Sequence, residues 1–259
     1  MRNLLWILMI ISSSAVAQRA ELISTSKTMY ERIVGNDQFG FTYFITNNIL
    51  HKSNGVEDIH YQNLGLGKIT YVDLNNPLKI VVFYADFNTV VLLDSQMNEV
   101  ATRNFSTLPT PIVVSAIGNA SQNRLWFYDT ISQQIGLYDV YSGTSKFITQ
   151  PLKGPFLYWI SDLNNFQWID QKQHRFSIDV YGKITDLGTV PIFDSILFVS
   201  NNEVIFKDAA SINYYKTDGK VIPLTEIPPN SFQSLRFADQ ILSIFTTNAI
   251  SNYKIFTTP

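Results

Sequence analysis

Residues 80–94 read IVVFYADFNTVVLLD, and this stretch decides the fold of the chain. Two apolar runs, residues 80–85 and 89–93, flank a short turn that contains Asp86 and Asn88. Short runs rich in Val, Ile, Phe and Tyr on either side of polar turn residues are typical of antiparallel β-hairpins. The stretch is therefore predicted to form two neighbouring strands, with Asp86 at the end of the first.

The same pattern of apolar run, polar turn and second apolar run returns along the whole chain. The residues that mark the end of its first run are Thr46, Asp86, Asp129, Asp170, Asp208 and Thr246, which lie 40, 43, 41, 38 and 38 residues apart. A repeat of this length built from short strands indicates a β-propeller, in which every repeat forms one blade. The chain is therefore predicted to be all-β, a single six-bladed β-propeller with four-stranded antiparallel blades. We name the strands of a blade A to D from the centre of the ring outward.

Turn residues recur in the same phase as the strands. Glycine falls repeatedly between the predicted C and D strands, where a tight hairpin needs a positive φ. These residues are Gly55, Gly143, Gly182 and Gly219. Asn98 is expected to take that position in the second repeat. The two Asp-Leu-Asn-Asn segments, residues 73–76 and 162–165, are interpreted as A–B turns rather than as fragments of calcium loops.

The two ends of the repeat array are incomplete in complementary ways. The last repeat offers an A strand at 234–238, a B strand at 241–246 and a C strand at 250–256, with no clear D strand after them. Residues 20–24 are strand-like and precede the A strand of the first repeat. We therefore expect this N-terminal strand to join the last blade, which closes the ring without an open seam.

The first 17 residues follow the order of a secretory signal peptide. Arg2 gives a positive start, residues 4–11 are apolar, and Ala15-Val16-Ala17 supplies the small residues for cleavage. We expect a signal peptide at 1–17, a β-propeller domain at 18–259, and a mature protein in the periplasm that associates with the outer membrane through a partner. No later apolar run reaches the roughly 20 residues of a membrane-spanning helix, so direct membrane insertion is not expected.

Composition limits the classes of function. The chain has 19 basic residues, 21 acidic residues and no Cys. Its net charge does not attract nucleic acid, and disulfides and thiolate metal sites are excluded. The three His residues, His51, His60 and His174, have no second His or carboxylate at metal-ligand spacing and are interpreted as surface or loop residues. With no nucleophile or phosphate-loop motif either, no catalytic residue, metal or cofactor is expected.

One face of the ring is the candidate surface for partner contact, because B strands end there and the connections between blades cross it. The repeated Asp residues are interpreted as hairpin residues that accept backbone hydrogen bonds, with an acidic rim for a cation or basic partner as the alternative. The D–A connections are apolar and rich in Pro, which suits protein contact, although Pro also serves simply to stiffen the crossings. The candidate contact residues are Asp86, Phe87, Pro109, Pro111, Asp129, Pro155, Phe156, Asp170, Pro191, Asp208, Pro228 and Pro229.

Residues 61–69 (YQNLGLGKI) and 73–94 (DLNNPLKIVVFYADFNTVVLLD) resemble a family of small exported β-propellers of the Bacteroidota. The resemblance is strongest over residues 61–98 and diffuse elsewhere. It implies a non-enzymatic periplasmic protein, monomeric within a complex, whose partner is an outer-membrane protein or a component of the type 9 secretion translocon. In its most specific form it implies a plug for the periplasmic opening of that translocon. It implies no active-site residue.

Two other functions remain open for a chain of this kind in the periplasm or outside the cell. A propeller enzyme, such as a hydrolase, lyase or lactonase, would gather His, Asp, Glu or Arg around a central channel. A carbohydrate-binding propeller would expose Trp side chains. Trp126 and Trp168 fall in predicted B strands and Trp159 in an A strand, so most of the Trp residues are expected in the core.

Overall fold

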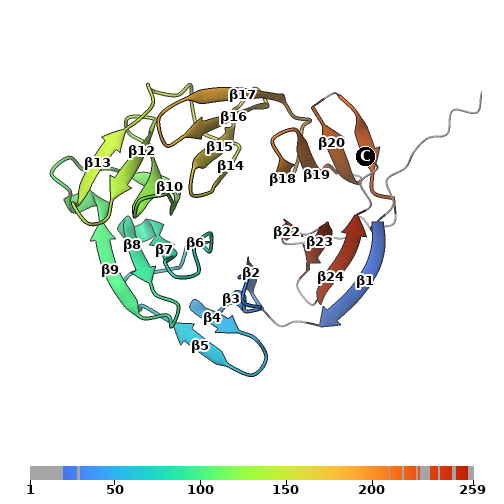
Figure 1. The fold of residues 1–259 in the computed structure, drawn as a ribbon, viewed down its shortest axis with the longest axis horizontal. Coiled ribbons are helices and arrows are strands. Elements are labelled where there is room, and N and C mark those ends of the chain that lie inside the picture. Colours follow the sequence, from blue (N-terminus) through green and yellow to red (C-terminus); the bar gives the residue numbers. More distant parts are fainter. Residues whose placement is uncertain are drawn as a thin grey trace, which may run out of the picture.

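The computed structural model describes residues 20–27, 30–209, 211–217, 219–225, 227, 234–238, 240–246 and 249–255. These residues form six four-stranded antiparallel sheets arranged as a ring (Figure 1). The predicted all-β, six-bladed propeller is therefore confirmed. The predicted signal peptide, Pro228 and Pro229 lie outside the described residues.

Each blade is built from strands that follow one another from the centre outward. Blade 1 contains β2 (Arg32–Asn36), β3 (Thr42–Thr46), β4 (Ile49–Ser53) and β5 (Asp58–Tyr61). Blade 2 contains β6 (Tyr71–Asp73), β7 (Ile80–Tyr84), β8 (Thr89–Leu93) and β9 (Glu99–Asn104). Blade 3 contains β10 (Val114–Asn119), β11 (Arg124–Asp129), β12 (Gln134–Asp139) and β13 (Thr144–Phe147).

The second half of the ring follows the same order. Blade 4 contains β14 (Tyr158–Ser161), β15 (Asn165–Ile169), β16 (His174–Asp179) and β17 (Ile184–Thr189). Blade 5 contains β18 (Ser195–Ser200), β19 (Glu203–Lys207), β20 (Ile212–Lys216) and β21 (Val221–Pro223). Blade 6 contains β22 (Ser234–Ala238), β23 (Ile241–Phe245), β24 (Ala249–Ile255) and β1 (Ala20–Lys27). Two short 3₁₀ turns, η1 (Ala85–Phe87) and η2 (Phe105–Thr107), lie in blade 2.

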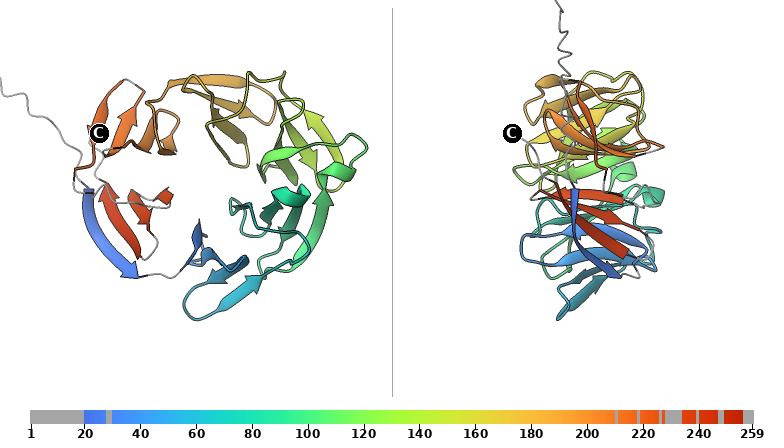
Figure 2. Two further views of the ribbon diagram at one scale, coloured as in Figure 1. Left: turned by 180° about the vertical axis from the view of Figure 1, so that it is seen from behind. Right: turned by 90° about the vertical axis from the view of Figure 1, so that its right-hand side faces the viewer.

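Blade 6 confirms that the N-terminal strand closes the ring. The strand β1 runs along the outside of β24 and pairs with it antiparallel, from Ala20 opposite Ile255 to Lys27 opposite Ala249 (Figures 1 and 2). Ala20 is fully buried, whereas the rest of β1 is exposed. Backbone pairing rather than side-chain burial therefore holds most of this strand in place.

Burial explains why the middle strands are continuous apolar runs instead of alternating patterns. Every residue of β7 and β8 is buried, because each face of the sheet packs against a neighbouring blade. On one side Val82 and Val91 join the blade 1 residues Tyr43 and Leu50, and on the other side the blade packs against blade 3. The outermost strand of a blade has no neighbour along its outer edge, so β13 and β17 are mostly exposed.

The C–D turns follow the glycine prediction with one correction. Gly55, Gly143, Gly182 and Gly219 all have positive φ, between 69° and 95°. In blade 2 the residue with positive φ is Met97 (66°), not Asn98 as predicted. The Met97 side chain is buried between blades 1 and 2, and this burial offsets the cost of the left-handed backbone, which is about 1 kcal/mol or more for a non-glycine residue.

The A strand of blade 3, β10, begins only at Val114, because the side chain of Asn88 binds the backbone just before it. The Asn88 amide donates to the carbonyl oxygen of Ile112 (2.6 Å), and its Oδ1 accepts from the Val114 N–H (3.0 Å). With these groups bound to Asn88, regular pairing of β10 starts only at Val114. Among the described residues, no helix is long and apolar enough to cross a membrane.

Candidate functional site

Antiparallel blades bring the B–C hairpins and the D–A connections to the same face of the ring. We call this surface the connection face, and the surface formed by the A–B and C–D turns the opposite face. In blade 4 the Gln171 amide of the B–C hairpin donates to the Pro155 carbonyl of the preceding connection (3.1 Å). In blade 2 a Cβ placed on Gly67 would lie 3.0 Å from Asp86 Oδ2. The predicted hairpin and connection residues therefore do share one surface.

An asparagine that the sequence analysis missed ties hairpin to connection in blades 1 and 2. The Asn48 amide donates to the Gly67 carbonyl (2.8 Å), and its Oδ1 accepts from the Ile69 N–H (2.8 Å). Asn88 makes the equivalent pair of bonds to Ile112 and Val114. Both asparagines have positive φ, and they lie 40 residues apart, so the repeat spacing could have revealed them.

The repeated Asp residues fall into two groups. The carboxylate of Asp129 accepts from the Val113 and Ser132 N–H groups (2.9 and 3.0 Å), and that of Asp170 accepts from the Lys172 and His174 N–H groups (2.8 and 2.9 Å). For these residues the interpretation as backbone hydrogen-bond acceptors in hairpins is confirmed.

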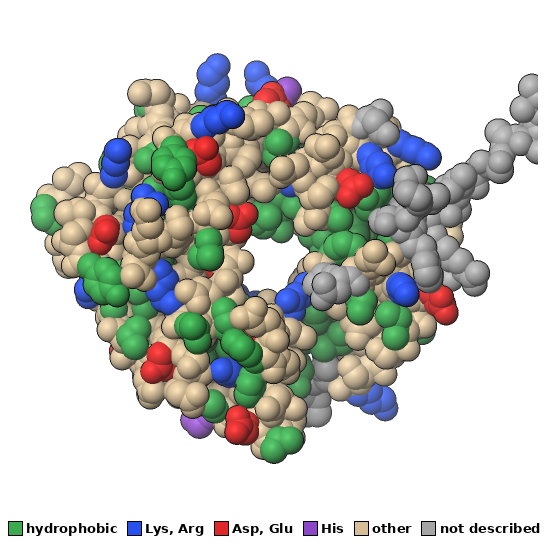
Figure 3. Space-filling model, in the orientation of Figure 1, with side chains coloured by type: hydrophobic (Ala, Val, Ile, Leu, Met, Phe, Trp, Pro, Cys, Tyr) green, Lys and Arg blue, Asp and Glu red, His purple; other side chains and the backbone are tan. Residues whose placement is uncertain are grey.

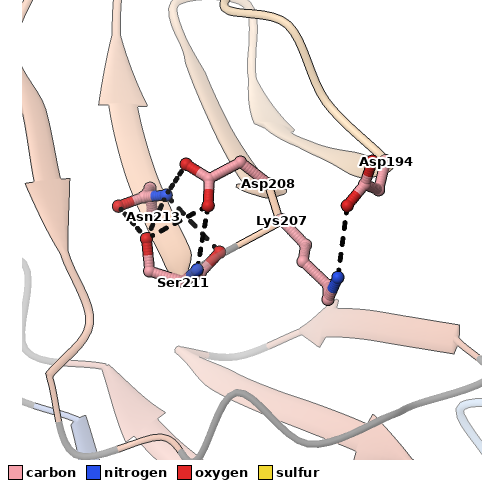
Figure 4. Close-up of polar contacts among 5 residues, drawn as sticks. All are labelled: Asp194, Lys207, Asp208, Ser211 and Asn213. Carbon is pink, nitrogen blue, oxygen red and sulfur yellow. Dashed lines mark hydrogen bonds and ion pairs between the residues drawn. The ribbon is translucent and has the colours of Figure 1, made fainter.

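Asp208 belongs to the same group, and Asp86 does not. The Asp208 carboxylate accepts from the Ser211 N–H (2.8 Å) and from the Asn213 amide (3.1 Å), beside an ion pair between Lys207 and Asp194 (3.2 Å) (Figure 4). Asp86 lies exposed in η1. The acidic residues of this face are therefore mostly engaged in their own turns.

Asp129 predicts a pH dependence of folding stability. Burial opposes its ionisation, but hydrogen bonds from Ser132, Val113 and Ile131 outweigh burial and lower its pKa. A lowered folded-state pKa means that the bonds stabilise the fold above the ordinary Asp value and that this contribution is lost as pH falls through the folded-state pKa. The Asp129→Asn variant should lose about 1 kcal/mol of unfolding free energy at pH 7.

Urea denaturation at pH 7 and pH 3 tests this dependence. The difference between wild type and Asp129→Asn should be smaller at pH 3, because the free energy contributed by the ionised carboxylate is lost as pH falls below the ordinary Asp value toward the lowered folded-state pKa. A difference of the same size at both pH values would contradict the assignment.

Apolar side chains protrude from both faces. On the connection face Leu64, Ile131 and Ile192 are 83%, 72% and 80% exposed, and Phe87 is exposed beside Asp86. Pro109, Pro111 and Pro155 are exposed, while Pro191 and Phe156 are half-buried. On the opposite face Tyr141 and Tyr181, in equivalent C–D turns, are 82% and 90% exposed.

A crevice of about 570 Å³ opens between blades 3 and 4. Its floor contains Phe156, Trp168 and Phe176, and its rim includes Asp170 and His174. The crevice is enclosed by residues 151–156 of the connection between the two blades and by the B–C hairpin, β16 and β17 of blade 4. The crevice therefore joins two predicted contact residues, Phe156 and Asp170, to aromatic side chains that the sequence analysis placed in the core.

Figure 3 shows a channel open through the centre of the ring. The innermost strands of blades 2, 3 and 4 are joined by a buried polar cluster that the sequence did not indicate. Asp73 accepts from the N–H groups of Asn75 and Asn119 (both 2.6 Å), and Asn75 donates to the Ser161 carbonyl (2.6 Å). Burial raises the pKa of Asp73, against the hydrogen bonds from Asn75 and Asn119 that lower it. Blades 2, 3 and 4 are thus linked through one turn.

The second Asp-Leu-Asn-Asn segment behaves differently, although both are A–B turns as predicted. The Asp162 carboxylate is exposed and accepts from its own turn, from the Asn164 and Asn165 N–H groups (2.7 and 2.8 Å), while the Asp162 backbone carbonyl accepts from the Trp126 indole N–H of blade 3 (2.8 Å). The Asp side chains of the identical tetrapeptides therefore differ: that of Asp162 bonds within its own turn, whereas that of Asp73 reaches Asn119 of blade 3.

A buried arginine joins blades 4 and 5. Arg175 donates to the carbonyls of Ser200 and Asn201 (2.8 and 3.3 Å) and to Gln167 Oε1 (2.7 Å), and its guanidinium lies 3.7 Å from the centre of the Phe198 ring. Burial lowers its pKa to about 10. Its partners are carbonyl and amide oxygens and an aromatic ring, so the residue serves packing between blades.

The histidines lie in strands and reach the surface, as one form of the sequence interpretation expected: His60 is exposed, and His51 and His174 are partly exposed. His51 and His60 are cross-strand neighbours in blade 1, and His51 Nδ1 lies 3.3 Å from Asp58. His174 Nδ1 lies 3.6 Å from Asp186. Within the described residues, no three His, Cys, Asp or Glu side chains gather as they would around a metal ion. Trp126 and Trp168 are buried and Trp159 is half-buried, which confirms the expectation for the core.

No family model and no curated protein matches the chain. Solved structures do resemble it. The β-propeller domain of Cps50 from Myceliophteria thermophila has a TM-score of 0.62 at 9% identity, over 92% of this chain and 100% of that chain. BBS1N, solved in complex with ARL6DN, has a TM-score of 0.58 at 11% identity, over 87% of this chain and 78% of that chain.

A streptogramin B lyase has a TM-score of 0.56 at 13% identity, over 91% of this chain and 98% of that chain. At these identities the likeness concerns the fold alone. Proteins with a shared fold carry out unrelated functions, so the site residues must carry the functional argument.

Proposed function

We propose that this protein is a non-enzymatic β-propeller that binds a protein partner through its connection face. The main observation behind this proposal is that apolar side chains protrude from this face, while most of its acidic residues accept hydrogen bonds within their own turns. Leu64, Ile131 and Ile192 are largely exposed, and Asp129, Asp170 and Asp208 accept hydrogen bonds from their own turns. Protruding apolar side chains on a rigid scaffold suit an interface, because burying them needs little ordering of the backbone.

The stiffness of the connections supports this choice of face. Pro109, Pro111 and Pro155 are exposed on it, and the Asn48 and Asn88 side chains hold the connections of blades 1 and 2 against their hairpins. BBS1N, one of the propellers with this fold, was solved bound to another protein. BBS1N shares only the fold with this chain, so the choice of binding surface rests on the residues of this chain.

The narrower form of the proposal concerns location and partner. The signal-peptide pattern at 1–17 and the resemblance over residues 61–98 support a periplasmic protein whose partner is an outer-membrane protein. In the most specific form of the proposal, the propeller covers the periplasmic opening of the type 9 secretion translocon. Experiments can test directly whether residues 1–17 act as a signal peptide and which protein is the partner.

Site-specific photo-cross-linking in the source organism tests the face and the partner together. The photo-reactive residue p-benzoylphenylalanine is placed at Ile131 or Ile192 on the connection face, and at Tyr141 or Tyr181 on the opposite face. We expect the first pair to give cross-links to one outer-membrane protein, identified by mass spectrometry, and the second pair to give none. Cross-links only from Tyr141 and Tyr181 would overturn the assignment of the face.

Charge substitutions give the matching affinity measurement. Ile131→Glu/Ile192→Glu should weaken binding to the identified partner at least about tenfold, as expected for losing apolar contacts at an interface centre. Tyr141→Glu/Tyr181→Glu carries the same added charge and should leave affinity unchanged. A metal-dependent hydrolase activity of the purified protein would contradict the non-enzymatic part of the proposal.

A further inference from the structure

We propose that His51 and His60, on the outer strands of blade 1, bind a divalent transition-metal ion such as Zn²⁺. This site is separate from the protein contact proposed for the connection face, because β4 and β5 form the outer rim of the ring (Figure 1). The spacing of the histidines along the chain gave no sign of a metal site. The fold brings the two side chains together, since β4 and β5 pair antiparallel with His51 opposite His60.

The two imidazoles are close enough to share one ion. Their ring centroids lie 6.1 Å apart, with the planes inclined by 39°. Residues directly opposite in an antiparallel pair have Cβ atoms roughly 4.5–5.5 Å apart, and their side chains point to the same face of the sheet. A zinc ion binds each imidazole nitrogen at about 2.0–2.1 Å. Because His60 is exposed, its ring can turn toward His51 until one nitrogen of each ring reaches the same ion.

The His51 ring is held in place by its neighbours. It stacks on Phe44, its cross-strand neighbour in β3, with centroids 4.7 Å apart and planes inclined by 3°. Phe44 stacks in turn on Tyr30 at 3.9 Å and 24°. Only 21% of the His51 side chain is exposed. One ligand is therefore preorganised by packing, and the exposed His60 is the ligand that adjusts.

Asp58 supports His51 as a metal ligand. Its Oδ1 lies 3.3 Å from His51 Nδ1. When Nδ1 donates a hydrogen bond to this carboxylate, Nε2 carries the lone pair that a metal ion needs. Carboxylates in this position orient metal-binding imidazoles and raise their basicity. With two nitrogen ligands from the protein, water completes the coordination. Imidazole ligands suit Zn²⁺, Cu²⁺ and Ni²⁺, whereas Mg²⁺ and Ca²⁺ prefer oxygen ligands.

His174 in blade 4 offers a comparison within the same chain. It stacks on Phe176 at 6.0 Å and 19°, and its Nδ1 lies 3.6 Å from Asp186. It therefore has an aromatic neighbour and a carboxylate, as His51 has. Its cross-strand partner, however, is Thr189 and not a second histidine. Comparing the two positions isolates the contribution of the second imidazole.

Calorimetric titration of Zn²⁺ into the purified propeller, without an affinity tag, tests the site. We expect wild type and His174→Gln to bind one ion per chain with the same affinity. His60→Gln should bind it at least about tenfold more weakly, because a single imidazole remains. Asp58→Asn should weaken binding about tenfold, as is usual for the loss of a carboxylate that supports a ligand. Because His60 and Asp58 are exposed, these variants leave the core of the blade intact.

NMR of the histidine ring protons locates the ion, since the chain has three His residues. One equivalent of Zn²⁺ should shift the ring signals of His51 and His60 and leave those of His174 in place. Equal Zn²⁺ affinity of wild type and His60→Gln would overturn the inference, as would an equal loss of affinity in His174→Gln or binding of Mg²⁺ as tight as that of Zn²⁺. The cross-linking test of the connection face does not depend on these results, so the two proposals can fail separately.

Discussion

Oxidation of a Thr25→Cys/Ser251→Cys variant is expected to stabilise the propeller by about 5 kcal/mol over its reduced form. Thr25 and Ser251 are cross-strand partners between β1 and β24, and their hydroxyl oxygens lie 3.2 Å apart. The bond would close a loop between residues 226 positions apart, and restricting so long a loop removes much entropy from the unfolded chain. Because the chain has no Cys, no competing disulfide can form.

Urea denaturation of this variant with and without dithiothreitol gives the measurement, and the reduced form is its own control. The complementary change is deletion of residues 20–27, which leaves β24 without its outer partner and removes Ala20 from its cluster with Leu242 and Tyr253. We expect the shortened chain to unfold at lower urea and to aggregate through the free strand edge. Unchanged stability after deletion would show that β1 does not close the ring in solution.

The Gly118→Ala variant is expected to lose about 3 kcal/mol of unfolding free energy. A Cβ at this position in β10 would lie 2.1 Å from Ser161 Oγ and 2.7 Å from Asp73 Oδ2. Both are short side chains in crowded positions, and Asp73 is held by the N–H groups of Asn75 and Asn119. The clash therefore has to be relieved by moving blades 2, 3 and 4 relative to one another.

Gly65→Ala is the matched control for this substitution. Gly65 lies in the connection between blades 1 and 2, its φ is not positive, and an added Cβ would meet only Asn63 Oδ1 at 3.5 Å. Thermal and urea unfolding followed by circular dichroism should place Gly65→Ala within about 0.5 kcal/mol of wild type. If Gly118→Ala is equally mild, the polar cluster does not join the three blades as tightly as the geometry indicates.

The turns show how far sequence reasoning reached and where it stopped. Gly143 and Gly182 were correctly predicted in C–D turns, because a tight turn is decided by a few consecutive residues. The same reasoning chose Asn98 in blade 2, whereas the left-handed residue is Met97. Burial of the Met97 side chain between blades 1 and 2 decides that case, and burial of this kind depends on residues of another repeat.

Some features of the candidate site were also predicted from the sequence, and others were not. The repeat phase placed Asp129, Asp170 and Asp208 in hairpins, and each accepts backbone hydrogen bonds as expected. The crevice beside Asp170 was not predicted, because it depends on how residues 151–156 of the connection lie against the aromatic residues of blade 4. No pattern within a single repeat contains that information.

The sequence by itself determined the number of blades, the order of their strands and the closure by the N-terminal strand. The blades and their strand order follow from strand and turn preferences that act within about 40 residues and are repeated six times, and the closure follows from the complementary gaps at the two ends of the repeat array. Only the tertiary structure decided that the Asp73 carboxylate bonds to Asn119, 46 residues away, while the carboxylate of the identical turn at Asp162 bonds within its own turn. The physical reason is that burial and hydrogen bonding in the polar cluster and in the crevice arise between blades, where residues distant in the chain meet.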